Sequence, residues 1–245
     1  MTVFTYDDSK RSGACRDFLL SSGRVRGYKT LTILPIPTTR DGVHLSGSEV
    51  TLASLCIEAE EGEVYLGYGI PDFLRDALND AGATVVDAER DEIFLRANAR
   101  LTALATLAHI LSRGDVSVDS LSVGVVGYGR IGCELVRLLI SVGADVRVYS
   151  TRESTVLCLC ASGVSATQVK RGDRIPSVDI LVNTAPAKIF DTGDPISERT
   201  EILELAPGDN FGAADIRRMP SLPTRYYPIT AGVLYAESLL RALGV

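Results

Sequence analysis

The chain has 245 residues, 46% of them hydrophobic, and a formal net charge of −6. This composition indicates a globular protein that is long enough for two domains. Nucleic acid is disfavoured as a partner, because no basic excess is present to neutralise phosphates. Five cysteines without framework spacing are typical of a reducing compartment. The sequence shows no membrane-length apolar run and no signal peptide, so we expect a cytoplasmic protein that does not bind membranes.

The first third of the chain shows short apolar stretches that alternate with helical patterns. The stretches that predict strands are residues 2–6, 30–37, 63–68 and 83–88. Pro71 stands at the start of a predicted helix and Gly82 just past its end, the usual placement of these two residues. Strands alternating with helices indicate a mostly parallel sheet. We therefore expect a smaller, flavodoxin-like α/β domain over residues 1–92.

The rest of the chain predicts a second domain. Apolar residues at helical spacing fill residues 93–113, which we interpret as a connecting helix. A further series of strands and helices over residues 114–229 predicts a Rossmann dinucleotide-binding domain. The tail, residues 230–245, is an amphipathic helix that we expect to pack back on the first domain.

A glycine motif lies at the start of the second domain. The stretch SVGVVGYGRIG is an apolar strand that runs into Gly127-x-Gly129-x-x-Gly132, and a helical pattern and a second apolar strand follow. In this context the motif is typical of dinucleotide binding. The first glycine permits a tight turn, the second lets the backbone approach the pyrophosphate, and the third lets the helix pack on the strand. The helix N-terminus attracts the phosphates. A plain strand–turn–helix crossover is the alternative.

The end of the second apolar strand indicates which dinucleotide binds. NAD binders place an acid there for the ribose hydroxyls, whereas this chain has Ser150, Thr151 and Arg152. Hydroxyls and a guanidinium suit a 2′-phosphate, so we predict NADP(H) rather than NAD(H). In the alternative interpretation, Arg152 is only a solvated loop residue.

A third loop completes the predicted cofactor site. NTAPA follows the apolar strand DILV, and loops at the carboxyl ends of strands line the cleft in such sheets. We therefore expect Asn183, Thr184 and Pro186 to face the nicotinamide half of the cofactor. The predicted cofactor-binding residues are Gly127, Tyr128, Gly129, Arg130, Ile131, Gly132, Ser150, Thr151, Arg152, Asn183, Thr184, Ala185 and Pro186.

Some other kinds of chemistry are disfavoured. Neither His44 nor His109 follows the glycine motif, and a 2-hydroxy-acid dehydrogenase needs a catalytic histidine beyond it. Cys158 and Cys160 lack a partner pair, so no metal site is expected. Cys133 lies near a helix N-terminus, which lowers the pKa of a thiol, but we favour a buried structural cysteine there.

Six stretches in order along the chain resemble the family of the A subunit of dipicolinate synthase. They are ILPIPTTRDGV (33–43), ERDEIFLRANARLT (89–102), VGVVGYGRIG (123–132), DILVNTAPAKIF (179–190), LELAPGDNF (203–211) and SLPTRYYPITAG (221–232). The resemblance implies two domains with NADP between them. It also implies oxidation of a dihydrodipicolinate-type precursor to dipicolinate in spore-forming bacteria, together with a second, flavoprotein-like subunit. We further expect a homo-oligomer such as a dimer.

The resemblance also indicates where a dicarboxylate substrate binds. A pyridine dicarboxylate needs cationic or hydroxyl partners. Thr38, Thr39 and Arg40 follow the second strand and are the predicted substrate-binding residues of the first domain; an ordinary exposed turn is the alternative for Arg40. Arg225 is the predicted substrate-binding residue of the second domain. The predicted catalytic residues are Asn183, Thr184 and Thr230.

The chain departs from the family pattern at four positions that bear on catalysis. Leu101, Leu104, Ala206 and Ile229 stand where the family has a proline or polar, ionisable residues. One alternative interpretation is therefore a non-catalytic NADP-binding subunit or sensor that works with a second protein. Another is a divergent dehydrogenase with a different small carboxylate substrate.

Overall fold

The computed structural model describes residues 2–114, 116–174, 176–190, 200–208, 210 and 216–245. The chain divides into two compact units. Unit 1 combines Met1–Asn98 with Pro223–Val245, and unit 2 is Ala99–Leu222. The division falls inside the long helix α4 (Glu92–Leu111), the segment that the sequence predicts as a separate connector.

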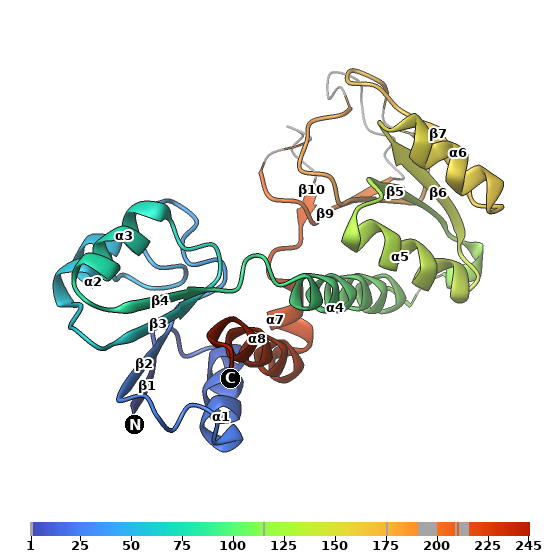
Figure 1. Cartoon of the computed structure of the whole chain (residues 1–245). Helices are drawn as coiled ribbons and strands as arrows, with labels where there is room; N and C mark the ends of the chain where they lie inside the picture. Colours follow the sequence, from blue (N-terminus) through green and yellow to red (C-terminus); the bar gives the residue numbers. More distant parts are fainter. Residues whose placement is uncertain (1, 115, 175, 191–199, 209, 211–215) are drawn as a thin grey trace. The chain divides into compact units, whose positions relative to one another are not determined.

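Unit 1 contains a parallel sheet with the strand order β1-β2-β3-β4 (Figure 1). The strands are β1 (Thr2–Thr5), β2 (Thr30–Ile33), β3 (Val64–Gly67) and β4 (Thr84–Asp87). The predicted α/β class with parallel strands is confirmed. The order has no reversal among the described strands, whereas the flavodoxin order 2-1-3-4-5 has one. β2 ends before Pro35 and Pro37, which lack the N–H that a ladder needs.

Helices cover both faces of this sheet. The helices of unit 1 are α1 (Lys10–Ser22), α2 (Leu52–Glu58), α3 (Asp72–Asp80), α7 (Leu222–Tyr226) and α8 (Pro228–Leu243). Figure 1 shows α2 and α3 on one face, with α1 and α8 on the other. Two apolar clusters fill the layers: Leu19 and Leu239 belong to the α1–α8 cluster, Leu55 and Leu74 to the α2–α3 cluster.

The carboxyl-terminal helix α8 packs directly on α1. A Cβ at Gly232 would stand 2.3 Å from the backbone oxygen of Arg11 and 2.8 Å from the Cβ of Ala14, so glycine permits this close approach. The packing corrects one expectation. The sequence assigns Arg225 and Thr230 to the second domain, but both lie in unit 1, because the chain returns to α1 after Leu222.

Unit 2 contains a parallel sheet with the strand order β7-β6-β5-β8-β9-β10. The strands are β5 (Ser122–Val126), β6 (Asp145–Ser150), β7 (Ser165–Gln168), β8 (Ile180–Asn183), β9 (Glu201–Glu204) and β10 (Ile216–Arg218). The helices after Leu111 are a 3-10 turn (Val118–Ser120), α5 (Arg130–Ser141) and α6 (Glu153–Ala161). In chain order this is the 3-2-1-4-5-6 arrangement of a doubly wound Rossmann sheet, so the predicted Rossmann fold is confirmed. The order reverses between β5 and β8, which is where such sheets bind ligands.

Local sequence signals find some helices and miss others. α3 begins after Pro71 and ends before Gly82, as predicted. α1 and α2 are not predicted, because their apolar residues do not repeat clearly at helical spacing. Among the described residues, no helix combines the length and the apolar character that crossing a membrane requires.

Candidate functional site

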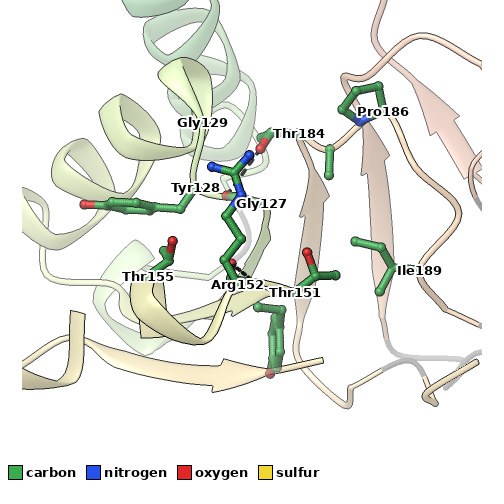
Figure 2. A pocket seen from close by; sticks show the side chains of 12 residues that line it. Gly127, Tyr128, Gly129, Thr151, Arg152, Thr155, Thr184, Pro186 and Ile189 are labelled. Atoms are coloured by element: carbon green, nitrogen blue, oxygen red, sulfur yellow. Dashed lines mark hydrogen bonds between the residues drawn. The ribbon is translucent and has the colours of Figure 1, made fainter. Parts of the chain in front are cut away.

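A cavity of about 220 Å³ opens at the carboxyl ends of β5, β6 and β8, at the switch point of the unit 2 sheet (Figure 2). It is lined by Gly127, Tyr128, Gly129, Tyr149, Ser150, Thr151, Arg152, Thr155, Thr184, Ala185, Pro186 and Ile189. The loops after three strands therefore meet at one place, and each of these loops carries residues that the sequence predicts to bind a cofactor.

The three glycines of the motif have different surroundings. Gly127 has φ +87°, and a Cβ there would stand 3.0 Å from Thr184 Oγ1. A Cβ at Gly132 would stand 2.3 Å from the carbonyl oxygen of Gly127. At Gly129 a Cβ would meet no atom within 4 Å. The turn and the helix contact therefore require glycine for reasons internal to the fold. The space at Gly129 is open and borders the cavity, which fits a ligand that approaches the backbone.

The loop after β8 is fixed to the glycine turn. The Thr184 hydroxyl donates to the carbonyl of Val126 at 2.8 Å and lies 3.4 Å from the carbonyl of Gly127. The Thr184 hydroxyl therefore holds the cavity wall in register with β5.

Asn183 faces away from the cavity. Its side chain is 1% exposed, its Oδ1 accepts from the Ala185 N–H, and its Nδ2 donates to the Ala185 carbonyl. Nδ2 also donates to Glu204 Oε1 at 2.9 Å, and the Ala206 N–H donates to the same oxygen. The sequence predicts that Asn183 contacts cofactor and substrate. The structure instead makes it a positioning residue, because its amide is used within the loop and by Glu204.

Glu204 is the buried partner that the sequence does not reveal. It ends β9 and is 4% exposed. Burial raises the pKa of this carboxyl, while hydrogen bonds from Asn183, Asn210 and the Ala206 backbone act in the opposite direction. Glu204 thus ties the loop after β8 to the loop after β9.

The loop after β6 forms the side of the cavity expected to bind the ribose. The Arg152 N–H donates to Ser150 Oγ at 3.1 Å, and Arg152 is the N-cap of α6. Figure 2 shows the Arg152 side chain extending into the cavity, with Thr151 and Thr155 nearby on the same side. Glu153 stands in the first turn of α6 and is exposed. This side of the cavity therefore presents a cation, hydroxyl groups and a helix N-terminus.

Tyrosine side chains complete the wall. Burial raises the pKa of Tyr128 to about 12, and a hydrogen bond with Cys133 acts in the same direction. Tyr149 is 7% exposed and makes an edge contact with Phe190. Tyr128 is therefore un-ionised at neutral pH and does not repel a phosphate.

Most predicted cofactor residues line the cavity, but not all do. Arg130, Ile131, Gly132 and Asn183 are outside the lining, although Arg130 and Ile131 begin the helix that faces it. The lining residues that the sequence does not predict are Tyr149, Thr155 and Ile189. Thr155 lies one helical turn beyond Arg152, so a helix predicted at that point would have pointed to it.

The predicted substrate residues of unit 1 lie in the loop after β2. Thr38 is fully buried and its hydroxyl donates to the carbonyl of Tyr68, while Thr39 Oγ1 accepts from the Gly42 N–H. These two hydroxyls therefore shape the loop. Arg40 lines a hollow of about 450 Å³ together with His44.

An Asp–His pair fixes the same loop. His44 Nδ1 lies 2.8 Å from Asp41 Oδ2, and the backbone N–H groups of Val43 and His44 donate to Asp41 Oδ1. These contacts, the His44 N–H first, hold the pKa of Asp41 well below its usual range. Within the described ranges, no three His, Cys, Asp or Glu side chains come together in a way that would hold a metal ion.

Comparison with known proteins follows the same outline. The A subunit of dipicolinate synthase from Bacillus subtilis (strain 168) is 26% identical over 228 residues, covering 86% of this chain and 76% of that protein. The chain resembles dipicolinate synthase. The resemblance predicted from the sequence is thereby confirmed. No protein-family model matches the chain. Asp209 and Phe211, in the fifth stretch of the resemblance, lie outside the described residues.

Solved structures show the same fold. The crystal structure of the A subunit of dipicolinate synthase from Bacillus halodurans covers 99% of this chain and 97% of its own, with a TM-score of 0.71 and 21% identity. A transhydrogenase from Sinorhizobium meliloti covers 98% of this chain and 91% of its own, with a TM-score of 0.62 and 15% identity. The fold is therefore shared with an enzyme that is more distant in sequence than dipicolinate synthase.

Proposed function

We propose that the chain is an NADP-dependent oxidoreductase that oxidises a small carboxylate, a dihydrodipicolinate-type precursor, to dipicolinate. One observation carries the proposal. The glycine turn lies at the switch point of a 3-2-1-4-5-6 sheet, and its middle glycine borders the cavity with open space where a Cβ would stand. This is the geometry that dinucleotide pyrophosphates require. The resemblance to dipicolinate synthase supports the choice of substrate.

The side of the cavity around Arg152 supports NADP over NAD. A 2′-phosphate carries a dianionic group that a guanidinium binds with charge-assisted hydrogen bonds. The Thr151 and Thr155 hydroxyls and the N-terminus of α6 lie on the same side. Glu153 is the one feature there that favours NAD, because a carboxylate accepts hydrogen bonds from ribose hydroxyls. Glu153 is exposed in the first turn of α6, where it also complements the helix dipole.

The residues of the chain act by binding and orientation. The bound nicotinamide supplies the hydride acceptor for the oxidation. Thr184 and Pro186, after β8, form the wall that orients the ring, and Asn183 with Glu204 holds that wall in place. Removal of a hydride and a proton aromatises a dihydropyridine dicarboxylate. The reaction therefore requires only that the substrate carbon be held near the ring and that water be excluded.

The test is a kinetic assay with the dihydrodipicolinate precursor. With NADP and precursor present, absorbance of the reduced nicotinamide should rise in step with the appearance of dipicolinate. The Gly129→Val variant serves as the negative control. Normal NADPH binding with no turnover in the presence of the precursor would contradict the proposed reaction but leave the cofactor site intact.

A non-catalytic NADP-binding subunit is the second candidate. The specific observation in its favour is that Asn183, the amide predicted to act in catalysis, is buried and used by Glu204 and Ala185. The Bacillus subtilis relative is named as one lettered subunit of its enzyme, which supports a partner protein in either case. Purification of the chain together with a tagged flavoprotein-like second subunit, followed by the same assay, separates the two candidates. Activity only in the complex supports a shared enzyme, and no activity in either state supports the sensor.

A further inference from the structure

Arg11 is a buried cation in unit 1. It is the second residue of α1, directly after the carboxyl end of β1, and it is 8% exposed. Its Nη1 lies 3.3 Å from Thr224 Oγ1 on α7. Its Nε and Nη2 are covered and have no hydrogen-bond partner among the described residues. Two of the donor groups of this guanidinium are therefore left without an acceptor.

The surroundings of Arg11 do not neutralise it. The ring of Tyr235 lies 5.8 Å from the guanidinium carbon, and Cys15 is fully buried beside it. Burial raises the pKa of Cys15 to about 12 and that of Tyr235 well above its usual value, so both are neutral. Asp7 is the carboxylate nearest in charge interaction, but no ion pair joins it to Arg11 among the described residues.

This arrangement has a cost without a visible return in the protein alone. Burial lowers the pKa of Arg11, because desolvation penalises the cation, yet an arginine stays protonated in proteins. A buried charge that lacks a partner destabilises a fold, and unsatisfied buried donors add to that. Such groups persist in folded proteins where a ligand supplies the missing partner.

The unpaired donors have the geometry of a carboxylate receptor. Nε and Nη2 form one edge of the guanidinium, and two parallel N–H bonds from that edge match the two oxygens of a carboxylate. The N-terminus of α1 is also positive and lies at the carboxyl edge of a parallel sheet, where ligands of α/β proteins bind. The Ser9 hydroxyl already caps that helix by accepting from the Ser12 N–H, so Ser9 is not the anion receptor.

We propose that Arg11 is the carboxylate-binding residue for the small substrate of this protein, through a two-bond contact from Nε and Nη2. The proposal rests on the proposed function and gives its substrate a specific binding group. It also differs from the residues that the sequence predicts, because Thr38 and Thr39 are used within their own loop. Binding requires the cover of Nε and Nη2 to open. α7, which carries Thr224, is a five-residue helix at the junction between the two units of the chain and is the segment that shifts.

The test compares ligand-induced stabilisation in matched variants. Thermal unfolding is recorded with saturating NADPH in metal-free buffer, with dipicolinate or with the uncharged pyridine-2,6-dicarboxamide. The wild type should melt at a higher temperature with dipicolinate and not with the diamide. Arg11→Met should bind dipicolinate at least about tenfold more weakly, because it loses a charge-assisted contact. Without dipicolinate it should melt no lower than the wild type, because it also loses an unpaired buried charge.

Two further variants keep the result decisive. Arg11→Lys retains the positive charge but not the two-nitrogen edge; it should keep NADPH affinity and lose most dipicolinate affinity. Arg16→Met, on the exposed side of the same helix, should bind dipicolinate like the wild type. Wild-type dipicolinate affinity in Arg11→Lys and Arg11→Met would overturn the proposal and leave Arg11 as a clamp on α7. Normal NADPH binding with no dipicolinate effect in the wild type would also overturn it, whereas loss of NADPH binding itself would count against the proposed function.

Discussion

The carbonyl oxygen of Gly127 lies 2.3 Å from the point where a Cβ of Gly132 would stand. No side chain fits at that distance, so α5 begins against the glycine turn only because residue 132 is glycine. The contact fixes where the N-terminus of α5 points, and the open cavity at Gly129 follows from it.

We predict that Gly132→Ala destabilises the fold. The added methyl group clashes with the Gly127 backbone, and overpacking of this kind costs about 1–3 kcal/mol of unfolding free energy. Urea unfolding measures the change. Gly13→Ala is the matched control, because Gly13 is also in a helix but a Cβ there meets nothing within 4 Å; it should be neutral or slightly stabilising. Equal stability of Gly132→Ala and the wild type would show that α5 does not depend on this contact.

Gly129→Val should separate binding from folding. The side chain enters open space, so the variant should unfold at nearly the wild-type urea concentration. Its two methyl groups occupy the space where the pyrophosphate would lie, and NADPH affinity should fall below detection. Calorimetric titration and urea unfolding of the same sample test both parts. A variant that binds NADPH normally would mean that the glycine turn is only a crossover between strand and helix.

Arg152→Ala and Glu153→Gln should change cofactor choice in opposite directions. Loss of the guanidinium removes a contact worth about 1.5–3 kcal/mol to a 2′-phosphate, so NADPH binding should weaken about tenfold or more while NADH binding changes little. Loss of the neighbouring carboxylate should strengthen NADPH binding, because it removes a repulsion. Fluorescence titration of each variant with both cofactors provides the measurement. If Glu153→Gln weakens NADH binding strongly instead, the acid binds the ribose and the protein prefers NAD.

The buried carboxyl of Glu204 should make stability depend on pH. Burial raises its pKa in the folded state above the unfolded value, so the folded chain binds a proton more tightly. The stability from Glu204 is therefore fully present below the unfolded pKa and is lost as pH rises through the folded pKa. Glu204→Gln should remove this dependence and flatten the profile above the ordinary glutamate pKa. Urea unfolding at a series of pH values compares the two proteins; a stability difference that is constant across pH would contradict the assignment.

Local patterns predict the part of the site that local structure forms. The strand before Gly127, the turn and the helix after it are neighbours in sequence, so their residue types reveal the cofactor loop directly. The hydroxyls and cation at Ser150–Arg152 also follow their strand immediately. For these segments the chemistry and the structure can be inferred from a few consecutive residues.

Long-range partners explain why other features are not visible in the sequence. The Asn183 amide looks available until Glu204, twenty-one residues later, is seen to accept from it. Arg225 and Thr230 change domain because α8 packs on α1, more than two hundred residues away from it in sequence. Arg11 has no sequence signature at all, since its interest lies in the absence of an acceptor in folded surroundings. Periodicity and motif spacing carry no information on such pairs.

Binding of NADP(H) at the glycine turn of unit 2 underlies both the proposed reaction and the role of Arg152. Isothermal titration calorimetry of the unmutated protein with NADPH and with NADH tests it most directly. We predict saturable binding of NADPH at one site per chain, about tenfold or more tighter than NADH. Failure of both cofactors to bind would contradict the dinucleotide site itself, and equal affinities would contradict the assignment of Arg152 to the 2′-phosphate.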